Sequence, residues 1–414
     1  MRVSINRIIE NNFHALTHKN FRYYWFGQCV SLLGTWIQNV GQSWLVLTIT
    51  KSAFLLGVLS AVQFMPVMLF SLFAGVIVDK IPKKKIIIIT QTVSMILAFV
   101  LSILVFTHKV QYWHVLILAA VLGFNNTFDM PARQSFIIDL VGKKDLMNAV
   151  ALNSATFNLA RILGPAVGAL MIAYFGIAWC FLINGISFVA VLIGLFSIKV
   201  AYKNTVNTVR GNMLGDIKEG ISYIFSNIEL LSIVIMVLIM GIFAYNFNVL
   251  IPVYTKDVLH MEEKAYGFLL SALGAGSFIG ALIASVRSKR GPKQKLMLFS
   301  SLTIGIGLIL TGITHEYYPA ALILFFTGIF NILFSTTANS TLQINSKNEY
   351  RGRVMSIYSL VFVGSAPLGS FLSGVFSEKL GANAAFIING AAVVIIMVLL
   401  MFIFRKGFAK EKVK

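Results

Sequence analysis

Long apolar runs alternate with short polar segments along almost the whole chain, and each run is close to the length of a membrane crossing. A spanning helix needs about 20 predominantly apolar residues to cross a hydrocarbon core of about 30 Å. Composition agrees, because 57% of the 414 residues are hydrophobic and only 12% are charged. The pattern predicts an all-α membrane protein with twelve transmembrane helices, at residues 22–48, 54–78, 85–107, 113–136, 149–173, 178–198, 229–253, 266–286, 295–314, 318–339, 353–376 and 383–404.

A polar stretch near the middle of the chain separates the first six predicted helices from the last six. Residues 199–212 are rich in polar side chains, and the segment that follows repeats apolar residues on one face of a helix. We therefore expect an N-terminal six-helix bundle at 1–198, a cytoplasmic linker with an amphipathic helix at 199–228, and a C-terminal six-helix bundle at 229–414.

Similar motifs follow corresponding helices in the two halves, which is the trace of an internal repeat. A small residue and then a short basic turn occur after the second predicted helix, at 75–85, and after the eighth, at 280–293. Gly164-Pro165 in the fifth helix has a counterpart in Ala366-Pro367 of the eleventh. A parallel duplication of six-helix halves is typical of alternating-access carriers.

Positive charges are distributed unevenly between the two sides that the predicted helices define. If both termini are cytoplasmic, the opposite side holds five of the 34 lysines and arginines: Lys51, Lys109, Lys256, Lys264 and Lys379. The cytoplasmic side then holds 27, in the segments 1–22, 80–85, 143–144, 199–218, 287–295, 347–353 and 405–414. Cytoplasmic loops carry an excess of Lys and Arg, so this asymmetry predicts cytoplasmic termini.

The distribution of polar residues argues against several other classes of protein. The net charge of +19 is spread over loop flanks instead of forming one basic stripe, which disfavours a nucleic-acid partner. Cys29 and Cys180 both lie in predicted spans without a CxxC or Cys/His partner, so we expect neither a disulfide framework nor a metal site. The sequence shows no nucleotide loop and no nucleophile with a base, so we expect no cofactor and no enzyme activity.

Away from the first residue of each predicted span, three charged residues lie within the spans: Asp129, Arg133 and Arg161. An ionised group at bilayer depth costs roughly 3 kcal/mol or more unless it is paired or hydrated, so it is a candidate for a substrate or ion route. Asp129 and Arg133 are four residues apart and share a helix face, so they can pair. Asp129 is either a proton carrier or half of a structural ion pair that anchors the inner end of its helix.

Arg161 lies near the middle of the fifth span, about 18 Å from its cytoplasmic end at a rise of 1.5 Å per residue. It is a candidate for binding an anionic group of a substrate or for tuning protonation. The alternative is a guanidinium that caps backbone carbonyls near Pro165.

Polar residues recur every three or four positions along the first span, which places them on one helix face. Such a stripe is unusual on a lipid-facing helix and predicts the wall of a hydrated cavity, although interhelical hydrogen bonds would also explain some of its members. The candidates are Gln28, Ser31, Thr35, Gln38, Asn39 and Gln42, together with Asn126, Asn158, Asn246, Asn331 and Ser335 on other spans.

These motifs together resemble those of a known family. The loop Gly75…Asp79-Lys80…Lys83-Lys84 resembles motif A of the major facilitator superfamily, and Gly164-Pro165-Ala166-Val167-Gly168 resembles motif C of its antiporters. The runs at 128–134, 158–161 and 351–356 are similar to those of the efflux branch that contains the enterobactin exporter and macrolide efflux proteins. The resemblance covers nearly the whole chain, from Phe21 to Arg405.

The chain departs from the family pattern at three places. Pro82 and Ala169 stand where motifs A and C usually have glycine, and Ser285 in the second half stands where the first half has Asp79. These differences leave the expected fold untouched, but they argue against equal gating by the two halves.

The resemblance implies a secondary active transporter, acting as a monomer in the plasma (inner) membrane of a bacterium. It would export a small amphipathic compound of the drug, macrolide or siderophore type by proton antiport and alternating access. Two other functions stay open: a facilitator or symporter that imports a metabolite, and a lipid-translocating protein of the same fold without proton coupling.

The resemblance also assigns a gating role to the loop of Gly75, Asp79, Lys80, Lys83 and Lys84. Asp79 would accept hydrogen bonds from the free N–H groups at the start of the eleventh span, where a helix dipole favours an anion. The alternative is that Asp79 merely offsets the charge of the neighbouring lysines.

Overall fold

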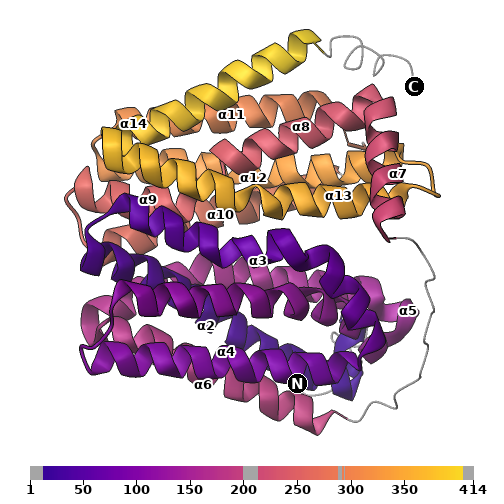
Figure 1. Ribbon diagram of the computed structural model, residues 1–414, viewed down its shortest axis with the longest axis horizontal. Coiled ribbons are helices and arrows are strands. Elements are labelled where there is room, and N and C mark those ends of the chain that lie inside the picture. Colours follow the sequence, from indigo (N-terminus) through magenta and orange to yellow (C-terminus); the bar gives the residue numbers. More distant parts are fainter. Residues whose placement is uncertain (1–12, 199–212, 288–290, 293, 404–414) are drawn as a thin grey trace, which may run out of the picture. The chain divides into compact units, whose positions relative to one another are not determined.

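The computed structural model describes residues 13–198, 213–287, 291–292 and 294–403, and these residues form helices joined by short turns, with no strand among them (Figure 1). The elements are η1 (His14–Thr17), α2 (Lys19–Thr50), α3 (Ala53–Lys80), α4 (Lys83–Phe106), α5 (Tyr112–Phe175), α6 (Ile177–Ser197), α7 (Met213–Ser226), α8 (Ile228–Phe243), α9 (Phe247–Asp257), α10 (Glu263–Arg287), α11 (Gln294–Ile313), α12 (Tyr317–Asn345), α13 (Arg351–Gly364) and α14 (Ala366–Ile403). The all-α membrane fold predicted from the sequence is confirmed.

Two of the helices are long enough for more than one crossing and turn at a glycine. Gly142, inside the 64-residue α5, has a φ of 71°, and Gly381, inside α14, has a φ of 85°. Side chains rarely adopt this left-handed backbone, which explains glycine at both turns. α5 thus covers the spans predicted at 113–136 and 149–173, and the helices of the described residues are consistent with twelve crossings.

Two predicted crossings are each broken into two helices. The span predicted at 229–253 stops at Phe243 and resumes at Phe247, where the Asn246 amide donates to the Ile242 carbonyl at 2.6 Å. The span predicted at 353–376 is interrupted at Ser365, just before Pro367, which lacks the N–H of a continuous helix. Broken helices are tolerated at membrane depth where protein covers the freed backbone groups, and Asn246 and Ser365 are both buried.

The chain divides into two compact units. The first comprises Met1–Leu45 and Leu69–Asn207, and the second comprises Val46–Met68 and Thr208–Lys414. The second unit therefore includes the end of α2 and the start of α3, which the sequence analysis placed with the first six helices. Of the linker expected at 199–228, residues 199–212 lie outside the described part of the chain.

The start of α3 is held within the second unit by close backbone and side-chain contacts. A Cβ atom at Gly57 would lie 2.8 Å from the Cα of Gly374 in α14, so the two helices approach at a pair of glycines. Glu378 accepts hydrogen bonds at 3.1 Å from the Ser52 hydroxyl and from the Phe54 N–H, and so caps the first turn of α3.

The amphipathic helix expected in the linker is present as α7 and docks on α13. The rings of Tyr223 and Tyr350 stack with their centroids 4.3 Å apart, and Arg353 donates to Glu219 at 2.7 Å. α7 is thereby fixed to the second unit.

The first unit contains an apolar core to which four helices contribute. Phe21, Ile87, Phe136 and Leu195 come from α2, α4, α5 and α6 and are almost completely buried. α4 packs against both α5 and α6. The charged residues of α5 therefore lie beside a tightly packed core.

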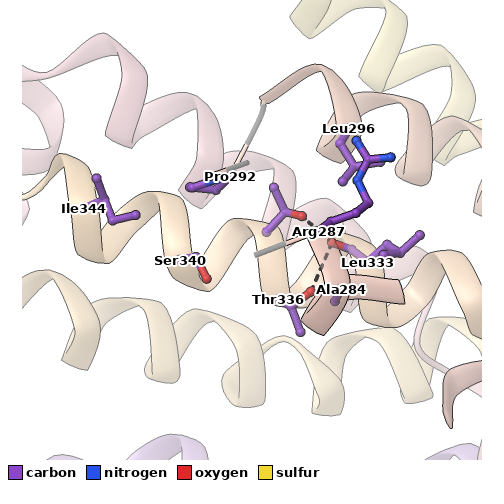
Figure 2. Close-up of a pocket in the computed structure, with 10 residues that line it drawn as sticks. Ala284, Arg287, Pro292, Leu296, Leu333, Thr336, Ser340 and Ile344 are labelled. Carbon is purple, nitrogen blue, oxygen red and sulfur yellow. Dashed lines mark hydrogen bonds between the residues drawn. The ribbon is translucent and has the colours of Figure 1, made fainter. Parts of the chain in front are cut away.

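Each unit also contains a cavity near its basic turn. In the second unit a cavity of about 200 Å³ lies among the end of α10, the start of α11 and the last turns of α12 (Figure 2). In the first unit a cavity of about 800 Å³ lies among the end of α3, the start of α4 and the middle of the first half of α5.

Candidate functional site

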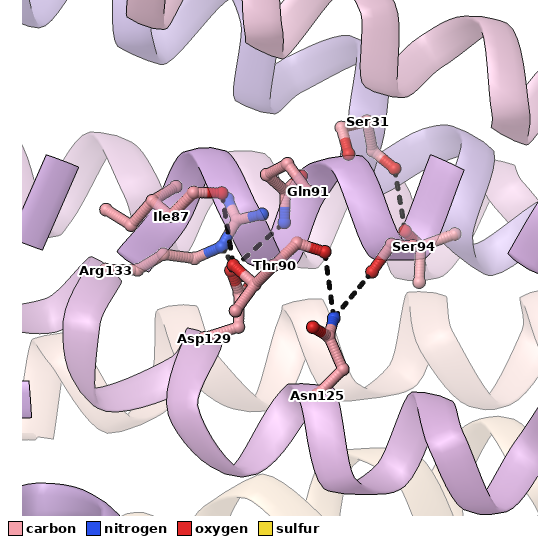
Figure 3. Close-up of polar contacts among 9 residues, drawn as sticks. Ser31, Ile87, Thr90, Gln91, Ser94, Asn125, Asp129 and Arg133 are labelled. Atoms are coloured by element: carbon pink, nitrogen blue, oxygen red, sulfur yellow. Dashed lines mark hydrogen bonds and ion pairs between the residues drawn. The ribbon is translucent and has the colours of Figure 1, made fainter. Parts of the chain in front are cut away.

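The carboxylate of Asp129 is surrounded by side-chain donors from two helices (Figure 3). Its Oδ1 atom accepts a hydrogen bond from the Thr90 hydroxyl at 2.5 Å and one from the Gln91 amide at 3.1 Å, both from α4. Its Oδ2 atom forms an ion pair with Arg133, one turn further along α5. The pairing of Asp129 with Arg133 is the contact that their four-residue spacing predicts.

Arg133 is in turn held by the packing of α2. Its guanidinium also forms a hydrogen bond with the hydroxyl of Tyr24, whose ring lies edge-on to Phe136 with centroids 5.6 Å apart. The side chains of Arg133 and Asp129 are only 18% and 10% exposed to solvent. The pair is therefore largely removed from solvent, and its two partners have little room to separate without movement of α2 or α5.

A second layer of hydrogen bonds fixes the helix that carries the donors. The Asn125 amide, one turn before Asp129, donates to the Thr90 carbonyl and to the Ser94 hydroxyl, both at 2.9 Å (Figure 3). Asn125, Thr90 and Ser94 are all buried. These contacts keep α4 in register with α5, so that the Thr90 hydroxyl faces the carboxylate.

The arrangement is suited to an ionised carboxylate. All three side chains that contact Asp129 donate, which matches the acceptor-only chemistry of the charged form. A protonated Asp129 would carry a donor of its own, which the Thr90 hydroxyl could accept while donating to the Ile87 carbonyl, 3.1 Å away.

Arg161, on the second half of α5, has a different set of partners. One terminal nitrogen donates to the Asn158 carboxamide oxygen at 2.8 Å, three residues earlier on the same helix. Its Nε atom is buried, and no hydrogen-bond partner for it is found among the described residues. Asp129 thus forms its ion pair with Arg133 and not with Arg161. The Nε–H of Arg161 can therefore donate to another acceptor.

The motif that includes Gly164, Pro165 and Gly168 forms a close helix contact. A Cβ atom at Gly164 would collide with Trp36 of α2, and one at Gly168 would lie 3.2 Å from the Cα of Ile37. Gly164, Pro165 and Gly168 are buried. This geometry agrees with the packing interpretation of the glycines, since small residues let membrane helices approach closely.

The polar stripe on α2 serves several neighbours. Gln38 accepts a hydrogen bond from Asn184 of α6 at 2.7 Å, and Thr35 donates to the Ser31 carbonyl of its own helix. Gln28 and Gln42 are buried, whereas Asn39 is half-buried. Gln38 therefore forms an interhelical hydrogen bond, which was the alternative to a role in lining a cavity.

The remaining cavity candidates differ in their surroundings. Asn246 and Ser335 donate to carbonyls of their own segments, Ile242 and Ile332, at 2.6 and 3.3 Å. Asn126 and Asn331 are half-buried. None of these contacts tests their role in binding a substrate, which stays a prediction.

The basic loop after α3 is partly used for helix capping. Lys84 donates to the Ile198 carbonyl at the end of α6, at 2.8 Å, a contact that stabilises a free helix C-terminus. Gly75 lies in α3 beside open space, Lys80 is exposed and Lys83 is half-buried. The side chain of Asp79 lies outside the described residues, so its proposed gating contact stays a prediction.

Several partners of the charged residues were not singled out from the sequence. Tyr24, Thr90 and Gln91 lie in other helices, and only the tertiary fold brings them to Asp129 and Arg133. In the second unit Glu229 accepts hydrogen bonds from Gln294 at 3.0 Å and from Asn345 at 2.5 Å. A signal was available for Thr90 and Gln91, because they are adjacent polar residues inside an otherwise apolar run.

The family follows from a comparison over almost the full chain. Residues 10–412 match the family described as transmembrane secretion effectors. The chain belongs to this family of the major facilitator superfamily. The transmembrane secretion effectors are membrane transporters, so the chain is a transporter and not an enzyme.

Characterised relatives extend over the same length. The staphyloferrin A transporter of Staphylococcus aureus is 28% identical, covering 93% of this chain and 96% of the relative. The multidrug efflux pump Tap of Mycolicibacterium fortuitum is 26% identical, with 89% and 92% covered. Macrolide efflux protein A of Streptococcus pyogenes is 22% identical, with 90% and 93% covered. The resemblance to the efflux branch is confirmed.

Solved structures support the fold of this transmembrane secretion effector. The crystal structure of the nucleoside transporter NupG matches with a TM-score of 0.71 at 13% sequence identity, covering 96% of this chain and 99% of that one. The crystal structure of a D-xylose-proton symporter matches with a TM-score of 0.73 at 14% identity, with 91% and 97% covered. At these identities the likeness shows the fold and carries no information on the substrate.

Proposed function

We propose that this protein is a secondary active transporter that exports a small amphipathic organic compound of the drug, macrolide or siderophore type, by proton antiport and alternating access. The observation that carries export is the full-length relationship to transmembrane secretion effectors and to two efflux proteins. Proton coupling rests on the geometry of Asp129.

Asp129 is the proposed proton carrier. In its observed setting its carboxylate accepts hydrogen bonds from Thr90 and Gln91 and pairs with Arg133. A movement of α4 against α5 that withdrew the Thr90 and Gln91 donors would favour binding of a proton, because hydrogen bonds to the charged form would be lost. Release of that proton would follow when the donors return.

Arg161 is the proposed contact for an anionic or strongly accepting group of the substrate. Its position near the middle of the fifth crossing and its unpartnered Nε atom support this role. Trp36 lies edge-on to Phe157 with centroids 5.9 Å apart, and Phe157 precedes Arg161 by four residues on the same helix face. A cation beside aromatic rings suits an amphipathic compound with an acidic or carbonyl-rich end.

The distribution of positive charge supports the proposed location in the membrane. The excess of Lys and Arg on one side supports cytoplasmic termini in a bacterial plasma membrane. We propose that one copy of the chain suffices for transport, since the fold places both six-helix halves in a single polypeptide.

Transport in everted membrane vesicles tests the proposal. Vesicles with an acidic interior are loaded with a fluorescent pH indicator, and drugs, macrolides and siderophore-type compounds are added one at a time. Proton-coupled export predicts that at least one compound dissipates the gradient in vesicles with the protein and not in vesicles without it. Uptake of a compound with no dependence on the gradient would favour a facilitator, and no response to any compound would contradict the proposed substrate class.

A further inference from the structure

We propose that the cavity of about 800 Å³ in the first unit binds an anionic phospholipid of the cytoplasmic leaflet. Its volume lies within the roughly 300–1,000 Å³ that is usual for ligand sites. No residue of the proposed substrate contact at Arg161 lines it. The inference takes from the proposed function only the orientation of the chain in the membrane.

The lining of this cavity carries two lysines at one end and is mostly apolar along the rest. Lys80, from the last turn of α3, and Lys85, from the first turn of α4, lie at the polar end. Most of the wall beyond them is apolar, including Ile89, Val93 and Phe124. The polar Thr90 and Asn125, which belong to the hydrogen-bond network of Asp129, also line it. A phosphate headgroup beside two lysines and an acyl chain along the apolar wall would match this distribution.

The exposure of two lining residues is consistent with an opening toward the hydrocarbon of the membrane. Ile89 and Phe124, which line it, are 53% and 49% exposed, and both belong to predicted crossings. Lys85 and Val93 are eight residues apart, which is about 12 Å along a helix. This depth is less than half of a hydrocarbon core of about 30 Å, so the cavity lies within one leaflet.

Charge complementarity selects the anionic class of lipid. Basic pockets between transmembrane helices on the cytoplasmic side favour anionic headgroups, and each Lys or Arg near the surface contributes about 1 kcal/mol, equal to roughly a fivefold change in affinity. Lys80 and Lys85 are both exposed at this end, and the described lining of the cavity contains no acidic residue. A zwitterionic lipid would gain much less from the same site.

The corresponding place in the second unit differs, which provides an internal comparison. The cavity beside the second basic turn has a volume of about 200 Å³, and Arg287 is the only lysine or arginine in its described lining (Figure 2). Thr336 and Thr337 add polar side chains to its wall, and they donate to the Ile332 and Leu333 carbonyls, each at 2.6 Å. Since this space is small and less apolar, we assign the lipid to the first unit alone.

Lipid binding to the full-length protein in detergent is the test, measured by native mass spectrometry during titration with phosphatidylglycerol or phosphatidylcholine. The variants are Lys80→Gln/Lys85→Gln and, as a matched control, Lys143→Gln/Lys144→Gln, which changes two exposed lysines outside the cavity. We expect phosphatidylglycerol to bind the double variant roughly 25-fold more weakly than wild type and the control within twofold of it. A third variant, Val93→Trp, fills the apolar end and is expected to weaken binding without changing the charge.

Three results would overturn the inference. Phosphatidylcholine could bind as tightly as phosphatidylglycerol, or the Lys80→Gln/Lys85→Gln protein could bind phosphatidylglycerol as wild type does. An exported compound could also displace phosphatidylglycerol in proportion to its transport, and the cavity would then be a substrate site. None of these outcomes depends on proton coupling, so failure here and failure of the proposed function are distinguishable.

Discussion

Thr90 of α4 places its hydroxyl 2.5 Å from the Oδ1 atom of Asp129 on α5. Because Thr90 shares Asp129 with Gln91 and Arg133, the carboxylate is held by two helices at once. The hydrogen bonds of one carboxylate thereby depend on the relative position of α4 and α5. This contact is the most specific feature that the structure adds to the sequence.

Thr90→Val tests the contribution of that contact. The change keeps the shape of the side chain but removes the donor, so we expect a loss of about 1.5–3 kcal/mol, as for other hydrogen bonds to charged groups. Thermal unfolding in detergent measures the loss. Thr92→Val is the matched control, since Thr92 donates only to the Ile88 carbonyl of its own helix. Equal stability of the two variants would contradict a role for Thr90 in holding Asp129.

Arg133→Gln should lower the stability of the fold more than removal of both charges of the ion pair does. Removal of the guanidinium leaves a buried carboxylate without its cation, and broken buried pairs typically cost about 3–5 kcal/mol. The double variant Asp129→Asn/Arg133→Gln removes both charges and should regain part of this stability. The coupling free energy is measured with a double-mutant cycle in detergent. Additive effects would show that the pair does not act as a unit.

Gly164→Ala should disturb the contact between α2 and α5. The new Cβ would collide with the Cβ of Trp36, which no rotation of the indole relieves, so we expect a loss of about 1–3 kcal/mol. Gly75→Ala is the control, because a Cβ there has no neighbour within 4 Å and alanine favours a helix. The measurement is the thermal midpoint of each variant. A Gly164→Ala midpoint equal to that of wild type would mean that α2 and α5 are less closely packed.

The turn between the two halves of α5 should show a pH dependence of its own. A hydrogen bond with His18, at 2.8 Å, lowers the pKa of Asp145, which lies outside the predicted crossings. A carboxyl whose pKa is lowered on folding stabilises the fold above its unfolded pKa of about 3.9 and loses this contribution as the pH falls through the lower folded value.

Asp145→Asn should therefore lower the thermal midpoint near pH 7, by a small amount because the pair is at the surface, and flatten its fall below about pH 4, where wild type loses the same contribution. Asp139→Asn, on the same helix, is the control, because Asp139 lacks this contact and burial raises its pKa. An Asp145→Asn profile that is parallel to wild type at all pH values would contradict the assignment.

The parts of the site that depend on spacing within one helix were predictable from the sequence. The Asp129–Arg133 pair follows from a four-residue separation, and the close packing at Gly164 follows from small residues in an apolar span. The same reasoning located most helix ends to within a few residues, because hydropathy reports the bilayer directly.

Other features depend on tertiary contacts that no local pattern specifies. The sequence did not indicate that Gln38 would bond to Asn184 of α6 or that Thr90 would face Asp129, because both contacts join residues far apart in the chain. The break between α8 and α9 was also missed, since apolar composition is equally compatible with one continuous helix. The buried Asn246 at the break was noted only as a cavity candidate.

The most direct test of the account compares Asp129→Asn with Asp139→Asn in everted vesicles that have an acidic interior. Both variants neutralise one carboxylate on α5, but only Asp129 is buried among donors. For a compound that wild type exports, the account predicts that Asp129→Asn abolishes the compound-induced loss of the pH gradient, whereas Asp139→Asn behaves as wild type at equal amounts of folded protein. Full activity of Asp129→Asn would contradict proton coupling through this residue.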